Sequence, residues 1–103
     1  MGNTTGLSNA ELIAMLTALR GLDGSATLDV ASLADGAGAT STVAVTGAAL
    51  GDFVLVSLGV DLAGITVTAY VSAADVVSVR VQNESGGTVD LASTTVRVRV
   101  LPR

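Results

Sequence analysis

The sequence predicts an all-β protein, a small antiparallel jelly-roll-like sandwich preceded by one short N-terminal helix. From residue 25 onward, apolar and polar residues alternate with a period of two. The alternating runs are rich in β-branched residues, and turns rich in Gly and Asp separate them at intervals of about 8–12 residues. No helix-length pattern lies between the runs, which disfavours a parallel sheet. The 103 residues suit one domain. We expect an N-terminal arm and short helix over residues 1–24 and the sandwich over residues 25–103.

The helix is expected over residues 8–20. Ser8 and Glu11 have the spacing of a capping box, and Gly21 follows as the stop. The apolar residues of this segment recur at helical spacing and form one stripe. This stripe has two readings: it covers an open end of its own β core, or it reaches a neighbouring subunit or larger partner, with residues 1–7 as an arm. The stripe consists of Leu12, Ile13, Leu16 and Leu19.

Six clear strands are expected, with one or two weaker ones besides. The run 53–56 reads Phe-Val-Leu-Val and is apolar on both faces, as expected of a strand that is covered on both sides. Residues 36–41, rich in Gly and Ala, are expected to form a flexible loop. The expected strands lie at residues 27–30, 42–46, 53–56, 65–71, 77–82 and 96–100.

The composition disfavours catalysis. The sequence contains no His, Cys or Lys, so it offers no imidazole base, thiol nucleophile or usual zinc ligand set, and no evident base for its many Ser and Thr hydroxyls. Its Asp residues lie mostly at strand ends or beside glycine, as Asp23, Asp35 and Asp52 do, where Asp stabilises turns. We therefore expect no enzyme, no metal, no cofactor and no small-molecule substrate.

Charge and hydropathy point to a protein partner. The net charge of −4 argues against nucleic acid as a partner. The longest uncharged run, residues 36–51, is rich in Gly and shorter than the ~20 residues of a membrane-spanning helix, so no membrane insertion is expected. Half of the residues are apolar, yet only 2% are aromatic. A chain this small and this apolar is expected to hide apolar surface against other chains, in a homo-oligomer or on a partner.

Arginines supply the other candidate contacts. Arg97 and Arg99 share one face of the last predicted strand, and Arg80 has the same parity in an earlier one. If these strands are near neighbours, the three side chains form a basic patch that docks carboxylates of a partner, since Arg suits bidentate pairing at interfaces. The alternative is a solvated face on which the arginines pair with nearby Asp residues or with Glu84.

The stretch from residue 47 to residue 100 resembles a β-sandwich module of tailed-bacteriophage virion proteins. It is closest in character to capsid decoration (cement) proteins that have a jelly-roll body. The resemblance covers about half of the chain and rests on strands and turns. The segments that carry it are Gly-Asp-Phe-Val-Leu-Val-Ser at 51–57, Tyr-Val-Ser-Ala-Ala-Asp at 70–75, Val-Arg-Val-Gln-Asn at 79–83, a Gly-Gly turn, Val-Asp-Leu-Ala-Ser at 89–93 and Val-Arg-Val at 96–98.

The resemblance implies a structural virion protein. Such proteins generally trimerise, bind the outer surface of the phage head and staple neighbouring subunits of the major capsid protein. The protein would then lie on the capsid exterior, after assembly in the host cytoplasm. The alternative is a phage tail-associated or receptor-binding β module. The candidate partner-binding residues are Leu7, Leu12, Ile13, Leu16, Leu19, Arg80, Arg97 and Arg99.

Overall fold

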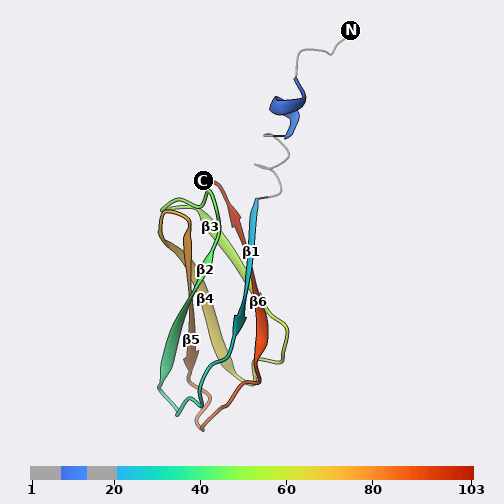
Figure 1. The fold of residues 1–103 in the computed structure, drawn as a ribbon. Coiled ribbons are helices and arrows are strands. Elements are labelled where there is room, and N and C mark those ends of the chain that lie inside the picture. Colours follow the sequence, from blue (N-terminus) through green and yellow to red (C-terminus); the bar gives the residue numbers. More distant parts are fainter. Residues whose placement is uncertain (1–7, 14–20) are drawn as a thin grey trace.

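The computed structural model describes residues 8–13 and 21–103, and residues 21–103 form a sandwich of two antiparallel sheets (Figure 1). One sheet has the strand order β1-β6-β3 and the other the order β2-β5-β4. The all-β fold class predicted from the sequence is confirmed. The strands are β1 (Leu22–Leu28), β2 (Gly38–Ala44), β3 (Phe53–Leu58), β4 (Ile65–Ala73), β5 (Val76–Asn83) and β6 (Thr94–Leu101).

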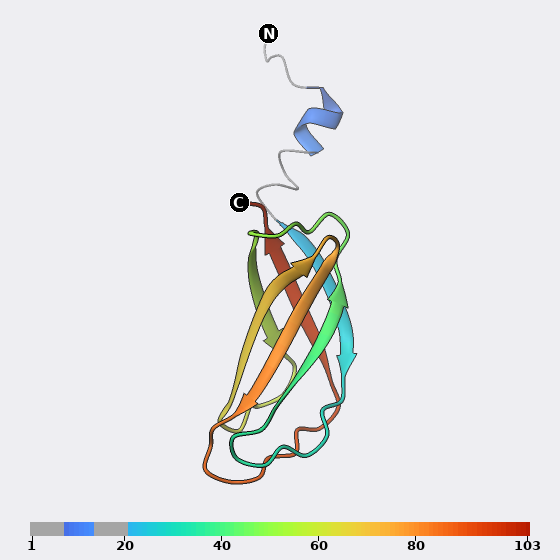
Figure 2. The same ribbon diagram turned by 90° about the vertical axis from the view of Figure 1, so that its left-hand side faces the viewer.

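The strands pair in a nested order. β1 pairs with β6, the last strand, and β2 pairs with β5. β3 joins the free side of β6, and β4 joins the free side of β5. Along the two borders of the sandwich, β1 packs beside β2 and β3 beside β4. This is the winding of a jelly roll with six strands in place of eight, and Figure 2 shows the β2-β5-β4 sheet in front of the other sheet.

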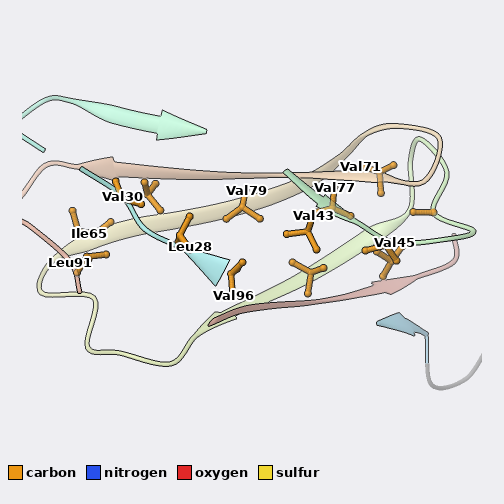
Figure 3. Packing of buried hydrophobic residues seen from close by; sticks show 14 of the residues in the cluster. Leu28, Val30, Val43, Val45, Ile65, Val71, Val77, Val79, Leu91 and Val96 are labelled. Atoms are coloured by element: carbon orange, nitrogen blue, oxygen red, sulfur yellow. The ribbon is translucent and has the colours of Figure 1, made fainter. Parts of the chain in front are cut away.

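The core between the sheets is built mainly from valine. In β6, Val96, Val98 and Val100 point inward and are at most 3% exposed, while the arginines between them face solvent. The inward positions of β5 repeat this pattern. Figure 3 shows these side chains meeting those of the facing strands. Burial of each valine stabilises the fold by about 1.5–3 kcal/mol, so many medium-sized aliphatic side chains replace the few aromatic ones of other cores.

β1 runs from Leu22 to Leu28, so it both begins and ends earlier than the strand predicted at residues 27–30. Asp23 and Gly24 read as a turn in the sequence but lie within the strand, where Asp23 pairs with Arg99 of β6. Gly24 points inward against β2. A Cβ atom there would lie 2.6 Å from Cγ2 of Val45 and 2.8 Å from the carbonyl oxygen of Ala44. The glycine therefore allows β1 to approach β2 closely.

The prediction of a flexible loop at residues 36–41 is wrong for most of this segment, because Gly38–Ala44 is strand β2. Gly38 faces the side chains of Arg80 and Gln82 on the neighbouring strand, and they occupy the space that a Cβ atom would take. Nη1 of Arg80 also donates a hydrogen bond of 3.2 Å to Oγ1 of Thr40. The small residues leave space for contacts between neighbouring strands. The local sequence does not reveal these contacts.

The capping box predicted at the N-terminal helix is confirmed. Residues 9–13 are helical. The backbone N–H of Glu11 donates to Oγ of Ser8 at 3.1 Å, and the N–H of Ser8 donates to Oε1 of Glu11 at 3.4 Å. The rest of the predicted helix, with Leu16 and Leu19, lies outside the described residues, as does Leu7.

Aspartates stabilise the connections, as predicted for Asp35 and Asp52. Each of four carboxylates accepts a hydrogen bond from a backbone N–H in a turn or between two loops. Asp23 differs, because it lies in a strand and binds an arginine. The four acceptors, with the donating residue and the distance, are Asp35 (Gly86, 3.1 Å), Asp52 (Ala49, 3.0 Å), Asp61 (Ala63, 2.9 Å) and Asp75 (Gly47, 2.8 Å).

Candidate interaction surface

The outer face of the β1-β6-β3 sheet combines an apolar strip with a charged one. The register places Phe53 of β3 beside Leu101 of β6, Leu55 beside Arg99, and Ser57 beside Arg97. On the other side of β6, β1 places Asp23 beside Arg99 and Ser25 beside Arg97. The outward side chains are thus apolar over β3 at one end of the sheet and polar over β6 and β1. We call the outward face of this sheet the β6 face. It includes the side chains of Asp23, Ser25, Phe53, Leu55, Ser57, Arg97, Arg99 and Leu101.

A shallow groove runs across the β6 face. It has a volume of ≈ 580 Å³ and lies open to solvent. Ligand pockets of this size usually enclose most of a small molecule, whereas this groove leaves one side open, which suits a segment or surface of another protein. Its lining residues are Asp23, Gly24, Ser25, Leu55, Val56, Ser57, Arg97, Val98 and Arg99.

The apolar strip consists of Phe53 and Leu55. Their side chains are 66% and 60% exposed, and Leu50, in the connection before β3, is 61% exposed. The sequence predicts that β3 is covered on both sides, and in the single chain this is wrong. Val54 and Val56 pack against the core, but nothing in the described part of the chain covers the outer positions. In the sequence, residues 53–56 do not alternate between apolar and polar. This pattern indicates an apolar outer face but does not identify what covers it.

Within residues 8–13 and 21–103, the charged strip contains one arginine in an ion pair and one without a partner. Nε of Arg99 lies 2.7 Å from Oδ1 of Asp23. The hydrogen bond to this carboxylate, followed by its charge, raises the pKa of Arg99. Arg97 has no hydrogen bond or ion pair with any residue that the structure describes. The strand register places Arg97 between Ser25 and Ser57, diagonally across from Leu55.

Arg80 does not join the other two arginines. It lies on β5, in the opposite sheet, and faces outward from that sheet, so the three arginines form no common patch. Nη2 of Arg80 donates to Oε1 of Gln82 at 3.0 Å, and Nε2 of Gln82 donates to Oε1 of Glu84 at 2.9 Å. Arg80 thus lies on a solvated face, as the alternative predicts, but within the described residues it reaches Glu84 only through Gln82 and forms no ion pair.

The outer face of the β2-β5-β4 sheet is the polar counterpart of the β6 face. Thr40, Thr42, Thr66 and Thr68 are exposed on its two edge strands. Tyr70, 54% exposed, is the large apolar exception on this face. It therefore offers a matched control for substitutions on the β6 face.

Two residues of the predicted helical stripe can be placed. Leu12 and Ile13 are 44% and 63% exposed, so no described residue covers them. Leu7, Leu16 and Leu19 lie outside the described residues. The structure thus adds Phe53 and Leu55 to the candidate contacts, and the sequence analysis missed both as partner-binding residues.

Among residues 8–13 and 21–103, no three His, Cys, Asp or Glu side chains are grouped so that they could hold a metal ion. Within the same ranges, no helix has the length and apolar character needed to cross a membrane.

Comparison of the chain with known proteins finds no matching family, no matching curated protein and no matching solved structure.

Proposed function

We propose that the protein is a non-enzymatic, structural component of a phage virion, a decoration protein that binds the outside of the head. The observation that carries this proposal is the β6 face. A small, acidic sandwich presents Phe53 and Leu55 to solvent beside the guanidinium of Arg97, which has no partner among the described residues. Exposed apolar side chains next to a free cation are typical of a surface that other protein chains cover. The resemblance of residues 47–100 to virion modules names the kind of assembly.

The mode of action follows from multivalency. Each copy carries only a few exposed apolar side chains, which suits weak individual contacts. In a trimer, three such contacts act together, because binding of the second and third becomes intramolecular. A trimer that spans several subunits of the major capsid protein would thus hold them against outward pressure. In this arrangement residues 1–20 and the base of the trimer contact the capsid.

Binding to capsid shells tests the proposal. The probe is a DNA-free shell assembled from the major capsid protein that is encoded with this chain, sedimented with increasing amounts of purified protein. We expect saturable binding by the full chain and loss of binding when residues 1–20 are deleted. Phe53→Ser, on the β6 face, should weaken binding, and Tyr70→Ser is its matched control and should bind normally, because Tyr70 faces away from the β6 face.

Three outcomes would count against the proposal or its parts. Failure of the full chain to bind the shell contradicts the decoration role. Binding to tail particles instead of shells would favour the tail-associated alternative. Unaltered shell occupancy after deletion of residues 1–20 would contradict the role of the N-terminal segment.

A further inference from the structure

The middle of the β6 face holds a row of three hydrogen-bond donors. The strand register places Arg97 of β6 directly opposite Ser25 of β1 and Ser57 of β3, and all three residues are exposed. Cβ atoms of directly opposite residues lie about 4.5–5.5 Å apart. A guanidinium has several N–H donors and no acceptor, and each serine hydroxyl can also donate. The row therefore offers one positive charge with a hydroxyl on either side.

The two serines hollow out this part of the face. Ser25, Ser57 and Arg97 line the groove on the β6 face, and the groove also reaches Val56 and Val98. Because Val98 points into the core and is only 3% exposed, its place in the lining shows that the groove extends down to the backbone of the sheet. Short side chains on both sides of a long one leave this space. A partner side chain that enters the groove meets the guanidinium and both hydroxyls.

The groove is locally positive on an acidic chain. Two arginines and one carboxylate line it, whereas the whole chain has a net charge of −4. The carboxylate belongs to Asp23 and is held by Arg99, whose Nε lies 2.7 Å from Oδ1. Arg97 has no ion pair or hydrogen bond with residues 8–13 and 21–103. The group that complements this groove is therefore a second carboxylate, placed at Arg97.

We propose that the groove receives an extended segment of a partner protein, in which a carboxylate side chain binds Arg97 and an apolar side chain two positions away covers Leu55. The inference rests on the proposed function, in which other protein chains cover the β6 face, and it adds the chemistry of the segment that docks there. A carboxylate suits the site because it accepts two parallel hydrogen bonds from a guanidinium and has further lone pairs for the hydroxyls of Ser25 and Ser57.

The spacing of the two contacts favours an extended segment. Leu55, 60% exposed, lies diagonally across from Arg97, and such positions on neighbouring strands are roughly 7–8 Å apart. In an extended chain, side chains at positions i and i+2 point the same way and lie about 6.6 Å apart, whereas those at i and i+1 point to opposite faces. The groove therefore favours an apolar residue and an acidic residue separated by one position over the same two residues in adjacent positions.

Nuclear magnetic resonance of the full chain labelled with ¹⁵N tests the contact, because each arginine gives its own Nε–H signal. The probe is the peptide acetyl-Thr-Leu-Thr-Glu-Thr-amide, titrated at millimolar concentrations. We expect the signal of Arg97 to shift until the site is saturated. The signal of Arg80 in the same spectrum is the internal control and should not move, because Arg80 lies on the opposite sheet and donates to Gln82.

Two further peptides separate the contributions of charge and spacing. The peptide with Gln in place of Glu should bind about tenfold more weakly or less, because it forms no charge-assisted hydrogen bond with the guanidinium. The peptide in which Leu and Glu are adjacent should also bind more weakly, because its two side chains point to opposite faces of the extended segment.

Substitutions in the groove provide the complementary test. Arg97→Gln should lower the affinity for the glutamate peptide to that for the glutamine peptide, and the two changes together should cause no further loss. Ser57→Val fills the groove beside Arg97 and should weaken binding several-fold. Thr68→Val is its matched control, because Thr68 is exposed opposite Arg80 on the other sheet. Circular dichroism of each variant checks that the fold is retained.

An Arg97 signal that does not move, or equal affinity for the glutamate and glutamine peptides, overturns the inference. Inorganic phosphate that shifts this signal at lower concentrations than the peptide also overturns it, because the groove would then be a site for small anions. The peptide result does not depend on a capsid. A shell that stays unbound while the peptide binds contradicts the decoration role alone, and a peptide that stays unbound while the shell binds contradicts this inference alone.

Discussion

The side-chain nitrogen of Asn83 donates a hydrogen bond of 2.8 Å to the carbonyl oxygen of Leu33, fifty positions earlier in the chain. The same nitrogen donates to the carbonyl oxygen of Gly87 at 2.7 Å, and Oδ1 accepts from the N–H and the hydroxyl of Ser85. Asn83 is fully buried, and its backbone N–H donates to the carbonyl oxygen of Ala37 at 2.8 Å. One polar side chain thus ties three segments together at the end of the sandwich remote from the helix.

Replacement of Asn83 should destabilise the fold. Asn83→Ala leaves the carbonyl oxygens of Leu33 and Gly87 without their donor in a buried setting, and we expect a loss of about 3 kcal/mol of unfolding free energy. Urea unfolding followed by circular dichroism measures the loss. Glu84→Ala, next in the chain but exposed, is the control and should change stability by less than about 0.5 kcal/mol. An unchanged midpoint for Asn83→Ala would show that water replaces its contacts.

Gly24 should resist even the smallest side chain. Gly24→Ala places a Cβ atom 2.6 Å from Val45 and 2.8 Å from a backbone oxygen of β2, so β1 must move away. We expect a cost of about 1–3 kcal/mol in the free energy of unfolding. Gly87→Ala is the matched control, because a Cβ atom there meets nothing within 4 Å. Equal stability of the two variants would contradict close packing of β1 on β2.

The ion pair of Asp23 and Arg99 should contribute little to stability. The two side chains are 67% and 53% exposed, so water and salt screen their attraction. Asp23→Asn should leave the urea midpoint nearly unchanged in comparison with Asn83→Ala. A large loss of stability, or a loss that disappears in high salt, would show that this ion pair stabilises the fold more than exposed ion pairs usually do.

The apolar strip should matter for assembly and leave the fold unaffected. Phe53→Ser removes an exposed ring that makes little contact with the core, so the thermal midpoint of dilute protein should stay within a few degrees of that of the natural chain. Binding to capsid shells, measured by co-sedimentation over a range of protein concentrations, should weaken by about tenfold or more. Tyr70→Ser should leave both quantities unchanged. A sharp fall in the thermal midpoint for Phe53→Ser would instead give this side chain a role within the single chain.

The sequence predicted most strands because alternation is a local property. In residues 77–82 and 96–100, apolar and polar positions separate cleanly, and the structure places them on the inner and outer faces as expected. The capping box of Ser8 and Glu11 was equally readable, since both partners lie within one helical turn.

The errors concern residues whose role depends on distant neighbours. Gly24 and Gly38 read as turn and loop, but each makes room for a strand that is far away in the sequence. The separation of Arg80 from Arg97 depends on which sheet each strand joins, and parity along the chain does not reveal it. The contacts of Asn83 reach fifty positions back, so no local pattern marks it.

The native mass of the full chain tests most directly the central claim, that the protein acts as a trimer. Light scattering of the protein as it leaves a size-exclusion column gives this mass without reference to shape. We predict about three times 10.1 kDa, retained on dilution. A mass of 10.1 kDa at every concentration would contradict the claim, because multivalent binding needs more than one copy.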